Sequence, residues 1–161
     1  MLYMQDHLKQ KEWVTMDKIQ ISLMNIQDIS DVLLLEKSHD IHILNSDILI
    51  SDLSKDNYYY IVAKIDNIIV GYAGISYILD SADLISIVVE KSQTKKGIAS
   101  SLLSNIYSFC INNGIIKILL EVRKSNIIAQ NLYEKQGFKK ISERKKYYDN
   151  IEDAYIYEKE L

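Results

Sequence analysis

Strand-like and helix-like hydrophobic patterns follow one another along the chain, and their order restricts the fold more than any other feature of the sequence. Runs that alternate apolar and polar residues predict strands, and runs with apolar residues three and four positions apart predict helices. In chain order these runs predict a strand, a helix, three strands, a helix, a strand, a helix and two strands. This order is typical of an α/β protein with a mixed central sheet of about six to seven strands and helices on both faces.

Turn and cap residues mark where the predicted elements begin and end. Asp66–Asn67 and residues 80–82 indicate tight turns, so the three strands around them are expected to be antiparallel neighbours. Gly114 and Gly137 are expected to end two helices. The nearly continuous apolar run at 115–122 predicts a strand that is buried on both faces. Strands are expected at 19–23, 58–65, 68–79, 83–90, 115–122, 138–148 and 154–160, and helices at 29–39, from 97 onward and at 126–136.

Length and composition indicate a single globular domain. With 161 residues, 48% of them hydrophobic, the chain can supply one continuous core. Residues 1–17 show no clear period and are expected to be an N-terminal extension of a domain at 18–161. Apolar runs stop well short of the roughly 18 residues of a membrane span, and the first residues lack a secretory pattern. We therefore expect a cytoplasmic protein with no membrane partner, as a monomer or weak homodimer.

The charges are distributed unevenly along the chain. A formal net charge of −3 argues against direct nucleic-acid binding, because such proteins usually carry a basic excess. The segment 25–60, however, holds seven carboxylates and two lysines, a local net charge of −5. It would attract a basic protein tail; the alternative is a solvated helix face. The seven carboxylates are Asp28, Asp31, Glu36, Asp40, Asp47, Asp52 and Asp56.

A basic turn between a predicted strand and a predicted helix indicates an anion site. Gly97 and Ala99 remove side-chain bulk, so backbone N–H groups at the helix start can approach an anion closely. Lys95 and Lys96 add positive charge, and a pyrophosphate would suit this arrangement. The Walker and dinucleotide-binding glycine patterns are absent. The alternative is an exposed turn whose lysines are merely solvated.

A carboxylate and a phenol follow the next predicted strand. Glu121 lies at the end of strand 115–122, and Tyr133 lies on the helix behind it. Because ligands of open α/β sheets bind outside the carboxyl ends of strands, Glu121, Tyr133 and the Gly97 turn can line one crevice. Alternatively, Glu121 is a solvated charge and Tyr133 an ordinary core aromatic. The inner face of this helix is expected to consist of Ile128, Ala129, Leu132 and Tyr133.

Other chemistry has little support in the sequence. Cys110 is the single cysteine and lies in an apolar helical pattern, which predicts a buried, inert thiol. His7, His39 and His42 lie in no metalloprotease or hydrolase motif. Two solvated imidazoles explain His39 and His42 more simply than a metal pair without further ligands. No metal is expected.

Three segments of the chain carry recognisable motifs. The first is Ile87-Val88-Val89 followed by KKGIASSLL, the second is LEVRKSN with LYEKQGF, and the third is RKKYY with EDAYIY. In this order they resemble the coenzyme-binding strand, loop and helix, the catalytic segment and the C-terminal signature of the GNAT N-acetyltransferases, specifically the ribosomal-protein-alanine N-acetyltransferase branch. The segments occur in the family's order and spacing over roughly half of the chain. The resemblance implies the GNAT fold.

The resemblance also implies an activity: transfer of the acetyl group of acetyl-CoA to an amine, with the N-terminal alanine of a ribosomal protein as the expected acceptor. Glu121 matches the family's general base and Tyr133 its general acid. The alternatives are a GNAT acting on lysine side chains or a small amine, and a catalytically weak coenzyme-binding module that docks onto a partner. The implied coenzyme contacts are Ile87, Val88, Val89, Lys95, Lys96, Gly97, Ile98, Ala99, Ser100 and Asn126.

Two positions depart from the family pattern. Thr94 stands where the loop usually begins with Gln or Arg, which would remove a phosphate contact. Residues 43–46, Ile-Leu-Asn-Ser, stand where the family tends to have a Pro-Trp-Ser element near the acceptor site. The first departure bears on coenzyme affinity, and the second bears on the identity of the acceptor.

Overall fold

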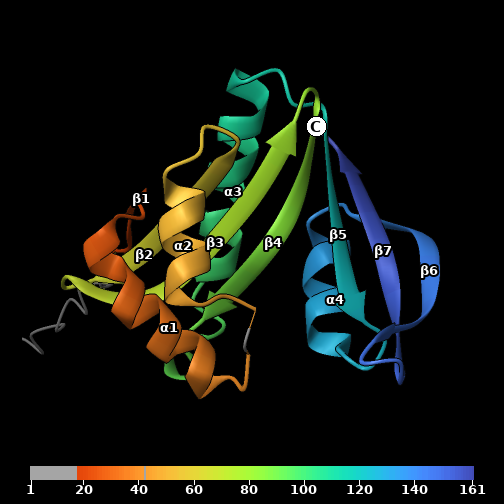
Figure 1. The fold of residues 1–161 in the computed structure, drawn as a ribbon, viewed down its shortest axis with the longest axis horizontal. Coiled ribbons are helices and arrows are strands. Elements are labelled where there is room, and N and C mark those ends of the chain that lie inside the picture. Colours follow the sequence, from red (N-terminus) through yellow and green to blue (C-terminus); the bar gives the residue numbers. More distant parts are fainter. Residues whose placement is uncertain (1–17, 42) are drawn as a thin grey trace, which may run out of the picture.

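The computed structural model describes residues 18–41 and 43–161, so the extension expected at 1–17 lies outside the described residues. Figure 1 shows a twisted mixed sheet with strand order β1-β2-β3-β4-β5-β7-β6. In the described part, no helix is long and apolar enough to cross a membrane. The strands are β1 (Gln20–Leu23), β2 (Tyr58–Ile65), β3 (Ile68–Ile78), β4 (Ser81–Val89), β5 (Lys117–Arg123), β6 (Lys139–Tyr148) and β7 (Glu152–Glu160). The helices are η1 (Ile26–Asp28), α1 (Ile29–Ser38), α2 (Ser46–Leu53), η2 (Lys91–Gln93), α3 (Ile98–Asn112) and α4 (Ile127–Lys135).

The three central strands β2, β3 and β4 form the antiparallel meander that their turns predict. Asp66 and Asn67 join β2 to β3 with φ angles of 49° and 63°, a left-handed conformation that Asp and Asn tolerate better than most residues. Gly114 and Gly137 follow α3 and α4 with φ angles of 72° and 88°. The predicted turns and helix ends are therefore confirmed within a few residues.

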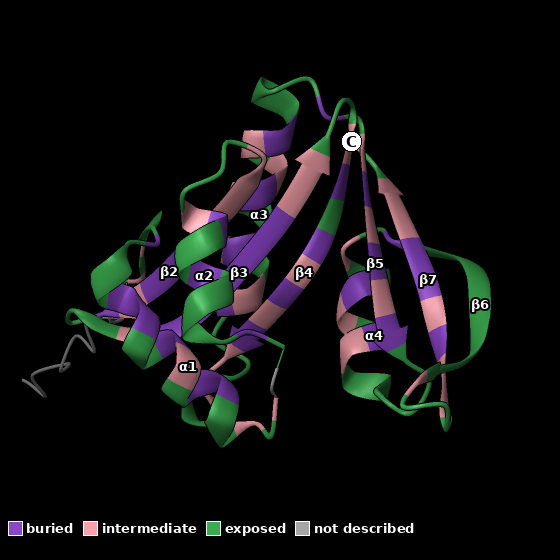
Figure 2. Cartoon of the chain, viewed as in Figure 1, coloured by how far each residue is buried: buried purple, intermediate pink, exposed green. Residues whose placement is uncertain are grey.

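Two apolar clusters lie on opposite faces of the sheet. Figure 2 shows buried segments, in purple, on the strands and on the helices that cover them. On one face, α1 and α2 cover β2, β3 and β4, and Val32 and Leu49 are completely buried there. On the other face, α3 and α4 contribute residues such as Leu102, Cys110 and Tyr133. The prediction of helices on both faces is confirmed, and Cys110 is a buried thiol as expected.

The parallel pair β4–β5 separates soon after it begins. Only Ser81–Asp83 of β4 pair with Lys117–Leu119 of β5. Beyond them the two strands diverge, which Figure 1 shows as the opening between β4 and β5. Gly74 and Ile75 of β3 pair with Ser86 and Leu84, so Ile85 is an extra residue in β4, a β-bulge. Because a bulge bends its strand, it favours divergence at this point.

Two sequence-based expectations about burial are wrong. The strand β5 is not buried on both faces: its residues alternate, with Leu120 and Val122 buried and the intervening side chains partly exposed, because no helix of the described residues covers the second face. On α4, Ile128 is 86% exposed rather than internal. Gln130 is buried instead, and its amide donates to the carbonyl of Lys124 at 2.9 Å, so a hydrogen bond fixes α4 against the end of β5.

We expect Gly74→Ala to lower the free energy of unfolding by about 1–3 kcal/mol, the usual cost of overpacking a core. A Cβ at Gly74 would lie far inside van der Waals contact with the Tyr60 ring. That ring is 2% exposed, and its hydroxyl donates to Asp52 at 2.9 Å, so it has little freedom to move. Urea unfolding measures the loss. In a Tyr60→Leu background the same substitution should cost clearly less; an unchanged cost would contradict this explanation.

Candidate active site

The basic turn leads into the N-terminus of α3. Gly97 is the N-cap residue with φ of 79°, and Lys95 has φ of 63°. The Ser101 N–H donates to the Gly97 carbonyl at 2.9 Å as the first bond of the helix. The N–H groups of residues 98–100 therefore have no helical acceptor. Together with the helix dipole, these groups favour an anion at this point.

The side chains of the turn are not all available to a ligand. The Lys96 ammonium donates to the side-chain oxygen of Gln93 at 2.8 Å, and the Thr94 hydroxyl donates to the Lys91 carbonyl at 3.1 Å. Ile98 is 1% exposed, so its side chain anchors α3 in the core and only its backbone faces the turn. The turn thus offers a ligand mainly backbone groups and exposed ammonium groups.

The edge of β4 that faces β5 is open beyond the paired residues. On the other edge, the Glu90 N–H donates to the Val70 carbonyl of β3 at 2.8 Å. Because successive residues of a strand direct their backbone groups to alternate edges, Ile87 and Val89 direct theirs toward the separated β5. The Val88 side chain is 4% exposed and packs in the cluster under α1 and α2. Of the predicted contacts Ile87, Val88 and Val89, only Ile87 and Val89 present backbone groups to the opening.

Two further predicted coenzyme contacts already hold neighbouring elements together. The Asn126 side-chain oxygen accepts a hydrogen bond from the Ala129 N–H at 3.1 Å and caps α4. The Ser100 hydroxyl accepts a hydrogen bond from the Gln136 amide at 3.2 Å, which links α3 to the end of α4. Both residues therefore have structural partners in the free protein.

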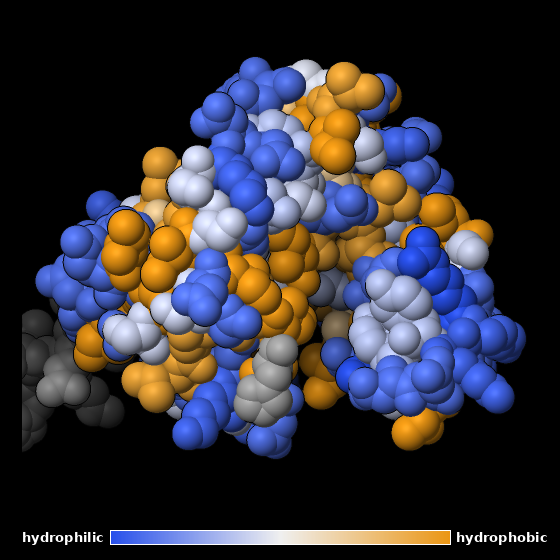
Figure 3. Space-filling model, in the orientation of Figure 1, coloured by the Kyte–Doolittle hydropathy of each residue, from blue (hydrophilic) through white to orange (hydrophobic). Residues whose placement is uncertain are grey.

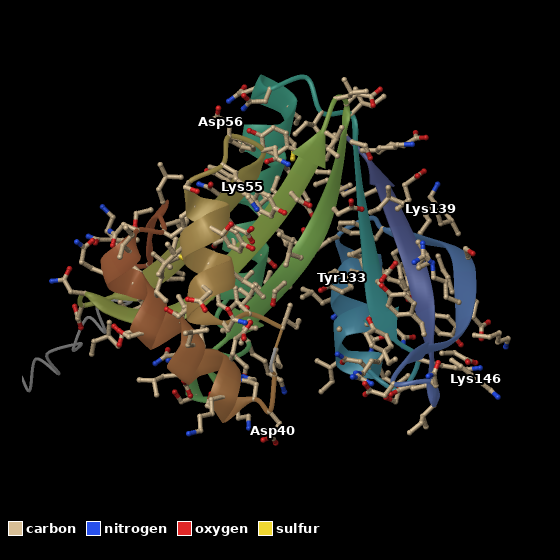
Figure 4. All side chains as sticks on the ribbon, viewed as in Figure 1. Asp40, Lys55, Asp56, Tyr133, Lys139 and Lys146 are labelled. Atoms are coloured by element: carbon tan, nitrogen blue, oxygen red, sulfur yellow. The ribbon has the colours of Figure 1, made fainter. Side chains whose placement is uncertain are left out.

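Tyr133 is buried on α4, on the side of β5 that α4 covers (Figure 4). Its ring packs edge-on against Phe138, with 5.6 Å between the ring centroids. Among the described residues its hydroxyl has no hydrogen-bond partner, yet every fully buried side-chain oxygen or nitrogen there has one. The hydroxyl therefore keeps contact with solvent. Burial raises the pKa of Tyr133 above its ordinary value, so the phenol keeps its proton at neutral pH.

A cavity of about 440 Å³ lies where β4 and β5 separate. Figure 3 shows the surface hollowed between the α1–α2 side and the β5–β7 side, with apolar side chains along the former. Glu121 projects into the cavity, and its carboxylate forms an ion pair with the Arg144 guanidinium at 2.9 Å. Asp83 lies across from it; burial and the Glu121 charge raise the pKa of Asp83. The apolar lining includes Ile43, Leu84, Ile85, Leu119 and Ile156.

The predicted site residues do not all line this cavity. Glu121 does, whereas Tyr133 and the Gly97 turn do not. Leu120 and Val122, the neighbours of Glu121, pack with Tyr133 in the cluster under α3 and α4, so Glu121 and Tyr133 lie on opposite faces of β5. The sequence predicted one crevice. The structure instead has an opening through the sheet, with Glu121 on one side and Tyr133 on the other. Asp83, Arg144 and Tyr147 also line the cavity. Asp83 was not among the predicted site residues, and Arg144 and Tyr147 entered the prediction only as part of the RKKYY segment.

The acidic segment is only partly a surface feature. Asp28, Glu36 and Asp52 are 5%, 2% and 6% exposed. Asp28 pairs with the Lys64 ammonium at 2.8 Å, and the other two accept hydrogen bonds from buried tyrosines. These three carboxylates are structural, so the predicted attraction of a basic tail falls to the exposed ones. The exposed carboxylates are Asp31, Asp40, Asp47 and Asp56.

The sequence of this region matches a known family. Residues 26–138 match the model of the acetyltransferase (GNAT) family. The chain belongs to the GNAT family. The protein is therefore a GNAT acetyltransferase, and acetyl-CoA is its acetyl donor.

Relatives of this GNAT protein have known names. A Bacillus subtilis protein provisionally named ribosomal protein bS18-alanine N-acetyltransferase is 31% identical over 141 residues, which cover 86% of this chain and 93% of the relative. An N-alpha-acetyltransferase of Saccharolobus solfataricus is 39% identical over 60% of this chain and 66% of its own length. The crystal structure of the Escherichia coli ribosomal-protein-S18-alanine N-acetyltransferase superposes with a TM-score of 0.81 at 26% identity, covering 89% of this chain and 94% of that one.

Proposed function

We propose that this protein transfers the acetyl group of acetyl-CoA to the N-terminal alanine of a ribosomal protein. The observation that carries the proposal is the small cavity at the divergence of β4 and β5, with the Glu121 carboxylate in it and the open β4 edge beside it. The names of the B. subtilis and E. coli relatives support the acceptor. An enzyme with this substrate would act in the cytoplasm.

Acetyl-CoA would bind on the side of β5 away from Glu121. The pyrophosphate would accept hydrogen bonds from the N–H groups of residues 98–100, with Lys95 and Lys96 adding charge. Backbone groups of Ile87 and Val89 would hold the pantetheine arm as an additional strand along β4. Asn126 would contact the same arm through the part of its amide that does not cap α4.

The acetyl transfer needs a neutral amine, a stabilised oxyanion and a proton for the departing thiolate. An α-amine has a pKa near 7.7 to 8.0, so a carboxylate such as Glu121, acting through water, is a sufficient base. The amine nitrogen attacks the thioester carbon, and a backbone N–H near Val89 would stabilise the oxyanion. The intermediate then collapses, the C–S bond breaks, and Tyr133 donates its proton to the sulfur. The products are the acetylated amine and free coenzyme A.

The acceptor would enter from the cavity side. The apolar side chains that line the cavity suit an uncharged first side chain such as that of alanine. Asp40 lies at the end of α1 below the opening in Figure 4, where an exposed carboxylate would attract a basic chain. The buried acids of α1 and α2 contribute less to this attraction.

The test is acetyl-CoA turnover, followed by thiol release and mass spectrometry of the product. The acceptors are a short basic peptide that begins with alanine, the same peptide with a blocked N-terminus and an internal lysine, and a polyamine. We expect acetylation of the free α-amine alone. Turnover with the blocked peptide or the polyamine would replace the proposed acceptor by a lysine or a small amine. Coenzyme binding without any turnover would favour a binding module.

A further inference from the structure

A carboxylate lies buried directly behind the wall of the acceptor cavity. Glu36 of α1 is 2% exposed, and its side chain accepts a hydrogen bond from the Leu44 N–H at 3.2 Å. It also accepts one from the hydroxyl of Tyr72, a β3 residue with no exposed surface. Burial and the bond to Glu36 raise the pKa of Tyr72, so its hydroxyl remains a donor. A buried carboxylate is costly unless it is hydrogen-bonded, and here each of its two oxygens accepts one hydrogen bond.

The hydrogen-bonded chain connects two walls of the cavity. The Tyr72 hydroxyl lies 2.9 Å from the hydroxyl of Ser86 in β4. Because the Tyr72 proton goes to Glu36, Ser86 is the donor in this pair. Leu44 follows Ile43, which lines the cavity on the loop side, and Ser86 follows the bulged Ile85, which lines it on the strand side. Glu36 and Tyr72 thus lie between the backbone segments that carry Ile43 and Ile85.

We propose that Glu36 is a positioning residue for the acceptor. It acts through Leu44 and through Tyr72 and Ser86 to set the separation of Ile43 and Ile85. This separation sets the size of the first acceptor side chain that the enzyme admits. The inference rests on the proposed use of the cavity for the acceptor. Leu44 is 8% exposed, so without Glu36 its N–H would lack a partner in a nearly dry site, and the loop would shift to satisfy it. The network reaches β4 at Ser86 and on the edge that pairs with β3, whereas Ile87 and Val89 direct their backbone groups to the other edge, so coenzyme affinity should be retained.

The test compares two buried tyrosines that have the same chemistry. Tyr72→Phe removes the link to Glu36, and Tyr60→Phe removes an equivalent bond from Tyr60 to Asp52, away from the cavity lining. Acceptor peptides that differ only in the first residue, Gly, Ala, Ser or Val, give kcat/KM for each protein. We expect Tyr72→Phe to change the Ala-to-Val ratio by about three- to tenfold, the effect of losing one hydrogen bond. Tyr60→Phe should leave the ratio unchanged, and neither should change KM for acetyl-CoA.

The outcomes separate positioning from a purely structural role. If Tyr72→Phe lowers kcat/KM by one factor for all peptides, or lowers only the melting temperature, the inference is overturned. Ser86→Ala, a smaller change at the end of the chain of bonds, serves if Tyr72→Phe does not fold, and the same ratio decides. Glu36→Gln keeps an acceptor for Leu44 but not the carboxylate, and should shift the ratio in the same direction. If the enzyme acetylates lysine or polyamine substrates instead, only the proposed acceptor is overturned, and the same variants are then compared with amines of increasing size. If no amine is acetylated, the proposed function and the inference about Glu36 are both overturned.

Discussion

Replacing Glu121 by glutamine is expected to lower kcat for acetyl transfer about 100- to 10,000-fold, the contribution typical of a positioned base. Glutamine keeps the size of the side chain in the cavity but cannot accept a proton from the attacking amine or its water. The ion pair with Arg144 is also lost, but both side chains are partly exposed, so stability should change by less than about 1 kcal/mol. Steady-state kinetics with the alanine peptide and a thermal melt measure the two quantities.

Arg144→Gln is the matched control for this prediction, because it breaks the same 2.9 Å ion pair and leaves the Glu121 carboxylate in place. We expect it to keep most of kcat. If the two variants lose kcat equally, the ion pair rather than proton transfer matters, and Glu121 is not the base. If Glu121→Gln keeps its activity, another group such as Asp83 across the cavity must take the proton.

Removing the hydroxyl of Tyr133 is expected to lower kcat about 100-fold or more, because the departing thiolate then lacks a positioned acid. The ring of Tyr133 remains against Phe138 in Tyr133→Phe, and the lost hydroxyl has no protein partner among the described residues. KM for acetyl-CoA and the melting temperature should therefore change little. Single-turnover measurement of acetyl transfer separates this chemical step from product release.

The pH dependence gives a second test of Tyr133. Burial raises its pKa above the ordinary value of 10.0, and an acid must be protonated to act, so Tyr133 should cause no loss of kcat below about pH 10. Below that, kcat/KM for the peptide should rise as its α-amine loses a proton near pH 8. Tyr107→Phe, on the neighbouring helix α3, is the control and should retain kcat. Two results would argue against Tyr133 as the acid. One is a wild-type kcat that already decreases with rising pH at values well below pH 10, and the other is a Tyr107→Phe variant as slow as Tyr133→Phe.

Much of the fold could be predicted because its signals are local. The alternating run of β2, the helical period of α3 and the turn at Asp66–Asn67 each depend on residues that are close in sequence. Gly97 could be placed at a helix start for the same reason. The burial of α4 was predicted less well, because Ile128, expected to be internal, is exposed and the polar Gln130 is buried. Gln130 donates a hydrogen bond to the carbonyl of Lys124 after β5, a contact with another element that a local pattern does not show.

The candidate site depended more on long-range contacts. Residue type and position singled out Glu121, Tyr133 and the Gly97 turn, but not the side of β5 on which each lies. Arg144 reaches Glu121 only because β6 pairs with β7 and β7 pairs with β5. Glu36 belonged to an acidic run by sequence, and its burial beside Tyr72 follows from the packing of α1 on β3.

The sequence by itself thus determined the order and type of the elements, the family and the chemical groups at hand, because hydrophobic period, turn residues and short motifs are properties of neighbouring residues. Only the tertiary structure decided where β4 leaves β5, which groups meet in the cavity and which acids are buried. Those features arise where segments far apart in the chain pack together: the bulge at Ile85 appears only in the register of β4 against β3, and the cavity exists only because β5 pairs with the first three residues of β4 and then separates.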